Sequence, residues 1–178
     1  RSRHEQGAEY HLVEQAGVPK DAAIIDVGAG SSTLVDHLLA RGYRDLTAVD
    51  LSAAALDAMR RRLGPGGSQV ALEVADVLDL HLGRQFALWH DRAVFHFLVE
   101  PADQQAYVAA ARRTVAIGGH LVIATFAPDG PETCSGLPVA RHDAASLAAC
   151  FGAGFELTES FAADHSTPWG STQRFTHA

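Results

Sequence analysis

The chain has 178 residues, 47% of them hydrophobic, and a formal net charge of -7, which predicts one globular domain with a sizeable core and no nucleic-acid partner. No apolar run reaches the roughly 18–20 residues that a membrane helix needs, and we expect neither a membrane partner nor a secretory signal. The two cysteines are too few and too far apart for a disulfide framework, so we expect a reducing, cytoplasmic location. The ten histidines are scattered along the chain, so we expect no metal site.

Strand-like and helix-like segments alternate along the chain after a first predicted helix over residues 8–17. Apolar runs predict strands over residues 22–27, 46–49, 70–74, 86–89, 120–126, 155–161 and 172–176. Amphipathic segments predict further helices that begin after Ser31 or Ser32, at Ser52, at Pro101 and at Asp143. Gly118-Gly119 is expected to separate a helix from the fifth strand, and the stretch around Cys134 is expected to be a loop.

This alternation is typical of a doubly wound parallel sheet. The last two predicted strands are joined by a loop alone, so we expect the last strand to run antiparallel to its neighbour. The sequence therefore predicts a single α/β domain over residues 1–178, with a seven-stranded, mostly parallel sheet and helices on both faces. Residues 1–20 are expected to form an N-terminal helix and lid segment, with further residues upstream because the chain starts without Met.

The most informative stretch is the glycine turn Gly28-Ala29-Gly30, which follows an apolar run that ends in Asp26 and Val27. Glycines let the backbone approach a ligand closely. A carboxylate about 20 residues further on can accept the hydroxyl protons of a ribose, and Asp50 occupies that place. The stretch therefore predicts a site for a nucleoside cofactor.

Acids stand at the ends of four predicted strands: Asp26, Asp50, Asp76 and Asp91. Open α/β sheets bind ligands at the carboxyl ends of their strands, so we expect these acids near one site. We assign Asp26 to the glycine turn, Asp50 to a ribose, and Asp76 to an exocyclic amine, with the Val77 N–H facing an adenine ring. Single acids at strand ends are often helix caps, but four of them beside a glycine turn favour a site.

A nicotinamide fingerprint is the first competing interpretation, and it carries a third glycine. Here Ser31-Ser32-Thr33 follow Gly30, and Thr33 would crowd the helix–strand contact that this glycine permits. The dinucleotide interpretation also leaves Asp76 and the closing pair of strands unexplained. A nicotinamide-dependent oxidoreductase, or a nucleoside-binding module without catalysis, stays as the alternative of another class.

The sequence resembles the class I S-adenosylmethionine-dependent methyltransferases. Asp26-Val27-Gly28-Ala29-Gly30 is similar to their acid-x-Gly-x-Gly motif, Asp50 to their ribose-binding acid, Asp76-Val77 to their adenine-contact pair, and Gly118-Gly119-His120-Leu121 to their turn before strand five. The resemblance implies a Rossmann-like fold, S-adenosylmethionine as cofactor, and a cofactor site made of Asp26, Gly28, Ala29, Gly30, Asp50, Leu51, Asp76, Val77 and His90.

Three further segments resemble a group of bacterial class I methyltransferases of undefined substrate: 89–98, 126–138 and 165–170. Asp91-Arg92-Ala93 is also similar to an element of the thiopurine and tellurite methyltransferase branch. These resemblances imply a small-molecule acceptor such as a thiol, a selenol or a metalloid. A related element in some protein-lysine methyltransferases makes a lysine side chain the alternative acceptor. Relatives tend to carry a Ser-Trp-Tyr-Gln-like element where this chain has His4-Glu5-Gln6.

Methyl transfer from a sulfonium is an in-line displacement that depends mainly on holding the reactants in line in a site closed to water. A general base is needed for a protonated acceptor, and His96 is the first candidate, with a packed core histidine as the equal alternative. Asp91 is the second catalytic candidate, and Asp91 and His90 are expected to flank the methionine end of the cofactor or the acceptor.

Candidate acceptor-binding residues are Arg92, His165 and Trp169. Arg92 can bind an anionic acceptor or pair with a nearby acid. His165 and Trp169 lie on the loop between the last two predicted strands, where they can cover the acceptor, although a plain hairpin turn with a buried indole is the slightly preferred interpretation. Cys134 can bind a metalloid as a thiolate, or pack as a small apolar side chain.

Overall fold

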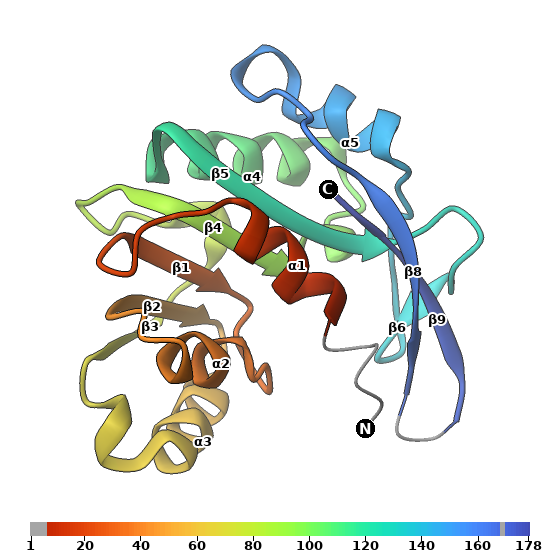
Figure 1. The fold of residues 1–178 in the computed structure, drawn as a ribbon. Coiled ribbons are helices and arrows are strands. Elements are labelled where there is room, and N and C mark those ends of the chain that lie inside the picture. Colours follow the sequence, from red (N-terminus) through yellow and green to blue (C-terminus); the bar gives the residue numbers. More distant parts are fainter. Residues whose placement is uncertain (1–6, 168–169) are drawn as a thin grey trace.

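The structure, a computed structural model, describes residues 7–167 and 170–178 (Figure 1). Its helices are α1 (Gly7–Gln15), α2 (Leu34–Ala40), α3 (Ala53–Leu63), α4 (Pro101–Thr114) and α5 (Ala144–Phe151). The strands of the main sheet are β1 (Ala23–Val27), β2 (Asp45–Asp50), β3 (Val70–Val74), β4 (Phe86–Arg92), β5 (Val115–Phe126), β8 (Phe161–Ser166) and β9 (Thr172–His177). A separate small hairpin consists of β6 (Thr133–Cys134) and β7 (Leu137–Pro138). None of the described helices has the length and apolar character that crossing a bilayer requires.

The main sheet has the strand order β3-β2-β1-β4-β5-β9-β8. The first five of these strands are mutually parallel, and β9 runs antiparallel to both β5 and β8. Helices α1, α2 and α3 pack on one face of the sheet, and α4 and α5 pack on the other (Figure 1). The predicted fold, including the antiparallel last strand, is therefore confirmed.

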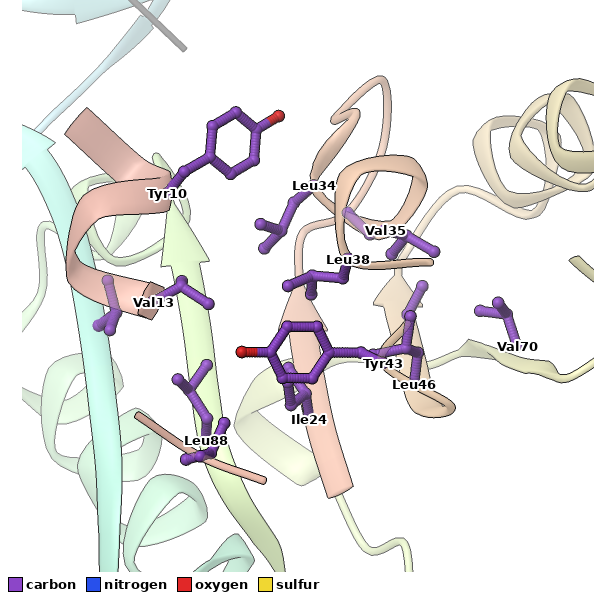
Figure 2. Packing of buried hydrophobic residues seen from close by; sticks show 14 of the residues in the cluster. Tyr10, Val13, Ile24, Leu34, Val35, Leu38, Tyr43, Leu46, Val70 and Leu88 are labelled. Carbon is purple, nitrogen blue, oxygen red and sulfur yellow. The ribbon is translucent and has the colours of Figure 1, made fainter. Parts of the chain in front are cut away.

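The core on the first face forms where two helices meet the central strands. Figure 2 shows Val13 of α1 and Leu38 of α2 near Ile24 and Leu88, which come from the adjacent strands β1 and β4. All four side chains are buried. This layer fixes the carboxyl ends of β1 and β4 relative to each other, and the candidate site lies at those ends.

At the starts of three of the predicted helices, a side chain accepts a hydrogen bond from a backbone N–H group. The Ser52 hydroxyl accepts a hydrogen bond from the Ala55 N–H at the start of α3, and Asp143 forms a capping box with Ser146 at the start of α5. At the start of α2, Ser32 Oγ accepts a hydrogen bond from the Leu34 N–H at 3.1 Å. Ser32 lies one residue before Thr33, the N-cap residue of this helix. These bonds satisfy N–H groups that a helix start leaves without an intrahelical partner.

The predicted strand over residues 155–161 is wrong. Pairing with β9 begins at Phe161, which lies opposite His177, and residues 155–160 have no ladder partner among the described residues. Their alternation of apolar and polar residues is strand-like, but an extended segment becomes a strand only beside another strand. The sixth strand along the sequence that joins the main sheet is therefore β8, which begins at Phe161, the last residue of the predicted strand.

Two other boundaries differ from prediction. Strand β5 begins at Val115 and runs through Gly118-Gly119, with a register shift against β4, so the two glycines lie within the strand and do not precede it. The predicted loop around Cys134 contains the β6–β7 hairpin. Its turn residues Ser135 and Gly136 have φ values of 51° and 80°, the left-handed pair that a tight two-residue hairpin requires.

Candidate functional site

Two adjoining cavities lie at the carboxyl ends of the parallel strands. The larger, of about 620 Å³, is bounded by the ends of β1, β2 and β3, by the segment after β4, and by the β6–β7 hairpin. The smaller, of about 220 Å³, lies between the glycine turn, the ends of β4 and β5, β6 and the β8–β9 hairpin. Val27, Gly28, Arg92 and Ala93 line both cavities. In Figure 1 the arrowheads of β1, β4 and β5 point toward β6 and the β8–β9 hairpin, which matches this arrangement.

The glycine turn needs glycine for reasons of space and of backbone angle. A Cβ atom on Gly28 would lie 2.0 Å from the Val94 side chain, and the φ of Gly28 is +64°. Gly30, with a φ of +32°, donates its N–H to Asp50 Oδ2 at 2.8 Å. The turn thus lies close against both the segment after β4 and the end of β2, at the floor of the two cavities.

Asp50 lies at the end of β2 and lines the larger cavity. Its Oδ2 accepts from the Gly30 N–H, and its Oδ1 accepts from the Ser52 N–H at 2.8 Å. A carboxylate offers about four lone-pair positions, so the group retains acceptor capacity toward the cavity. The next residue, Leu51, is 71% exposed and lines the same cavity, where it presents an apolar surface.

Asp76 and Val77 also line the larger cavity, next to the end of β2, where the Ala75 N–H donates to the Asp50 carbonyl oxygen at 3.2 Å. Asp76 Oδ1 accepts from the Leu78 N–H at 2.9 Å and caps a short 3-10 turn, Val77–Asp79. The structure therefore places the predicted residues Asp50, Leu51, Asp76 and Val77 around one cavity, and the carboxylates of Asp50 and Asp76 also close local turns.

Asp26 and His90 form a buried pair on neighbouring strands. Asp26 Oδ1 lies 2.8 Å from His90 Nδ1, and the two side chains are 3% and 1% exposed. Asp26 Oδ2 has no hydrogen-bond partner among the described residues, and Asp26 lines the smaller cavity. The prediction that Asp26 anchors the glycine turn needs correction, because the carboxylate that bonds the turn is that of Asp50.

Asp91 projects to the other face of the sheet and lines neither cavity. It is fully buried, and it accepts hydrogen bonds from the Val94 and Phe95 N–H groups and, at 2.5 Å, from the Tyr107 hydroxyl. Trp89 Nε1 donates in turn to the Tyr107 oxygen at 2.9 Å. Burial raises the pKa of Asp91 to about 6. In this geometry the carboxylate holds the turn after β4, where Ala93 has a left-handed φ of 68°.

His96 is fully buried in the short 3-10 turn Phe95–Phe97, and it also lines neither cavity. Its ring centroid lies 4.6 Å from those of both Phe97 and Phe126. Its ring nitrogens have no hydrogen-bond partner among the described residues. Burial, with a smaller contribution from His142, lowers the pKa of His96 to about 4. The imidazole is therefore neutral at physiological pH, but it is enclosed by aromatic rings.

The smaller cavity brings together Arg92, His165 and Cys134, three residues that the sequence singles out. Trp169, the third predicted acceptor-binding residue, and His4-Glu5-Gln6 lie outside the described residues. The sequence prediction did not include three other lining residues, Phe126, Gln173 and Phe175. Their alternation along the strands indicates which residues share a face, but only the sheet order shows that this face lies beside the glycine turn.

A family model described as "Methyltransferase domain" matches residues 24–119 of the chain. A curated protein-L-isoaspartate O-methyltransferase from Methylorubrum populi is 31% identical over 119 residues, which cover 67% of this chain and 52% of that protein. The chain therefore spans about half the length of this curated relative. The family match itself extends from β1 into β5 and includes the glycine turn, Asp50 and Asp76.

Solved methyltransferases share the fold. One is the 1,6-didemethyltoxoflavin-N1-methyltransferase of Burkholderia thailandensis with its acceptor and S-adenosylhomocysteine bound, with a TM-score of 0.76 and 22% identity over 98% of this chain and 76% of that one. Another is an S-adenosylmethionine-dependent methyltransferase from Clostridium acetobutylicum, with a TM-score of 0.71 and 14% identity over 97% and 90% of the two chains. The chain belongs to the methyltransferase-domain family.

Proposed function

We propose that this protein transfers a methyl group from S-adenosylmethionine to a small-molecule acceptor by in-line displacement. The observation that carries the proposal is the pair of cavities that meet at Gly28 and Arg92. One has the size and lining that suit an adenosine group, and the other is smaller and more polar. A ligand that occupies both presents its reactive end at their junction.

The residues present fit the cofactor. The exposed face of Leu51 and the Asp76-Val77 wall suit an adenine ring, and the spare acceptor capacity of Asp50 suits ribose hydroxyls. The buried Oδ2 of Asp26, which has no hydrogen-bond partner among residues 7–167 and 170–178, suits the cationic ammonium of the methionyl end. A side chain at Gly28 would strike Val94 and displace the segment that separates the two cavities.

When bound, the cofactor supplies the methyl group: a lone pair of the acceptor atom forms the new bond to the methyl carbon, the carbon–sulfur bond breaks with its electrons going to sulfur, and any acceptor proton leaves to water or a base. The chain's own residues hold the acceptor beside Gly28 and Arg92 and limit the access of water through the β6–β7 and β8–β9 hairpins. Asp91 is proposed to position the turn after β4. The prediction of His96 as the general base gains no support from the geometry, because its ring lines neither cavity.

A small acceptor is favoured by the volume of the second cavity, about 220 Å³. Thiols, selenols and metalloids are the acceptors that the resemblance to the thiopurine and tellurite branch implies, and the bound small molecule named for the Burkholderia thailandensis enzyme agrees with this size class. A protein lysine side chain is the alternative acceptor, since a lysine side chain is narrow enough to enter a cavity of this volume.

Two measurements test the proposal. In isothermal titration calorimetry, S-adenosylhomocysteine is expected to bind and NAD is not; the reverse result would assign the site to a nicotinamide cofactor. With trideuteromethyl S-adenosylmethionine, mass spectrometry of a panel of thiols, selenols, amines and a peptide pool is expected to show label in a small molecule. Label in the peptide pool alone would favour the lysine alternative.

A further inference from the structure

The loop that joins the glycine turn to α2 is held at two points by side chains of β2 and α3. At its start, Gly30 donates its N–H to Oδ2 of Asp50, the last residue of β2, at 2.8 Å. At its far end, the Ser32 carbonyl oxygen accepts a hydrogen bond from Arg62 Nη2 at 2.6 Å. Arg62 lies in the last turn of α3, so the helix that follows β2 reaches back to the loop that Asp50 also holds.

Arg62 connects three parts of the chain through one guanidinium. Its Nε donates to Asp36 Oδ1 at 2.9 Å, and its Nη2 donates to Asp36 Oδ2 at 2.8 Å as well as to the Ser32 carbonyl oxygen. Asp36 lies in the first turn of α2, which is next to α3 (Figure 1). The hydrogen bond to Asp36 is the main cause that raises the pKa of Arg62 above its ordinary value. The rigid fork of an arginine can bind a carboxylate and a carbonyl oxygen together, whereas a lysine ammonium lacks this fixed geometry.

The two contacts of the loop lie at different cavities. Asp50 lines the larger cavity, which is the proposed adenosine side. Ser31 and Ser32 line the smaller cavity, into which the methionyl end of the donor and the acceptor are proposed to extend. The bond from Arg62 to the Ser32 carbonyl oxygen therefore fixes the backbone of one wall of the smaller cavity, although Arg62 itself lines neither cavity.

Two arginines of α3 make ion pairs of different kinds. Arg60 pairs with Asp57 within the helix, and the side chains are 62% and 54% exposed, so solvent screens this pair and its contribution is small. The side chains of Arg62 and Asp36 are 34% and 32% exposed, and their pair is joined to the backbone of a cavity-lining residue. One arginine of α3 thus stays on its own helix, and the other reaches the wall of the candidate site.

We propose that Arg62 is a positioning residue, which holds the Ser31-Ser32 wall of the smaller cavity in place through the Ser32 carbonyl oxygen. This inference rests on the proposed methyl transfer and adds to it a residue that lies outside both cavities. When the clamp is removed, the loop adopts further conformations, and a ligand that enters the smaller cavity binds only the fraction of molecules with the wall in place. A ligand confined to the larger cavity does not depend on this fraction.

The test uses two ligands that share a nucleoside and differ in length. S-adenosylhomocysteine carries the amino-acid end that we expect in the smaller cavity, and methylthioadenosine lacks it. Both are titrated into the full chain by isothermal titration calorimetry. Arg62→Gln is expected to weaken the binding of S-adenosylhomocysteine about fivefold, because a partly exposed ion pair and its backbone contact are lost. The same variant should bind methylthioadenosine within about twofold of the wild type.

Two further variants separate positioning from charge. Arg60→Gln, on the same helix, is the matched control and should change neither affinity. Arg62→Lys keeps the charge without the fork, and it is expected to weaken S-adenosylhomocysteine as Arg62→Gln does. An unchanged affinity in Arg62→Gln, an equal loss for both ligands, or full rescue by Arg62→Lys would overturn the proposal. Failure of either ligand to bind the wild type would instead overturn the proposed function.

Discussion

Asp50, which we propose to bind the ribose, also holds the backbone that forms the candidate site. Its two oxygens accept from Gly30 and Ser52, one in the glycine turn and one at the start of α3. Asp76 does the same for its own short turn. A substitution at Asp50 therefore removes the proposed ribose contact and also leaves the partly buried Gly30 N–H without its acceptor, and each of these losses costs free energy.

We expect Asp50→Ala to weaken the binding of S-adenosylhomocysteine by an order of magnitude or more, because ribose hydrogen bonds and the turn are lost together. Isothermal titration calorimetry measures the effect directly. Asp57→Ala, at an exposed position of α3, is the matched control and should bind as the wild type does. Unchanged affinity in Asp50→Ala would contradict the placement of the ribose.

His96 is expected to make the stability depend on pH. Its folded pKa, about 4, lies below the ordinary value of 6.5, so the unfolded chain binds more protons between these values. Its contribution to stability is therefore present above pH 6.5 and is lost as the pH falls toward 4. Urea unfolding should show that wild type loses about 2 kcal/mol more than His96→Leu between pH 7 and pH 5. An equal loss in the two proteins would contradict the low pKa. Asp91, whose raised pKa acts in the opposite direction, is present in both proteins and cancels in the comparison.

The β6–β7 hairpin borders both cavities: Cys134 lines the smaller one, and Leu137 and Pro138 line the larger one. The hairpin thus contributes to the lining of both cavities. Its tight turn at Ser135-Gly136 keeps the hairpin short. An element that contacts cofactor and acceptor together can link the binding of one to the order of the other.

Cys134 should therefore report on the bound cofactor. We expect S-adenosylhomocysteine to slow the alkylation of Cys134 by N-ethylmaleimide several-fold, because the ligand fills the space beside the thiol. The other cysteine, Cys150, lies on α5 away from both cavities and serves as an internal control in the same peptide map. Equal rates at Cys134 with and without the ligand would place the hairpin away from the bound molecule.

Helix α4 supports the site from the far face of the sheet through Tyr107, which links Trp89 to Asp91. Tyr107→Phe leaves a buried indole N–H and a carboxylate each with one partner fewer. We expect the variant to lose about 1–3 kcal/mol of unfolding free energy in urea. It should also bind S-adenosylhomocysteine several-fold more weakly, because Asp91 holds the Ala93–Val94 turn against Gly28. Normal cofactor affinity with reduced stability would limit the role of Tyr107 to packing.

At the scale of the whole molecule, the proposed cofactor cavity joins segments from β1 to β7, so ligand binding should stabilise the entire domain. At a hundredfold excess over Kd, S-adenosylhomocysteine contributes about 2.7 kcal/mol. For a domain of this size that corresponds to a rise of about 5–10 °C in Tm, which differential scanning fluorimetry can measure. NAD at the same concentration should leave Tm unchanged, and an equal rise with NAD would contradict the choice of cofactor.

The sequence predicts the parts of this molecule that depend on local spacing. The glycine turn, Asp50, and Asp76-Val77 follow strands whose apolar runs are plain in the sequence, and parallel strands end at one edge. The faces of β4 are harder to predict: alternation separates His90 and Arg92 from Asp91, but it does not say which face borders a cavity.

Gln173 and Phe175 depend on a still less local fact, namely that β9 lies between β5 and β8. That order results from pairing between strands separated by a long segment, and no motif in the chain encodes it. The missed β6–β7 hairpin is different, since Ser135-Gly136 between Cys134 and Leu137 is a signal that the sequence does contain. The false strand over 155–161 shows the converse, a strand-like pattern without a neighbouring strand.

The two cavities draw on different parts of the polypeptide. Most of the larger cavity, the proposed adenosine side, comes from residues 27–99, whereas His165, Gln173 and Phe175 on the proposed acceptor side come from one terminal hairpin. Such a division makes the choice of acceptor separable from the use of the methyl donor. We expect substitutions on the inner face of β8 and β9 to change which acceptor is bound and to leave the binding of the methyl donor intact. A library intended to change the acceptor would therefore randomise the lining positions of the β8–β9 hairpin.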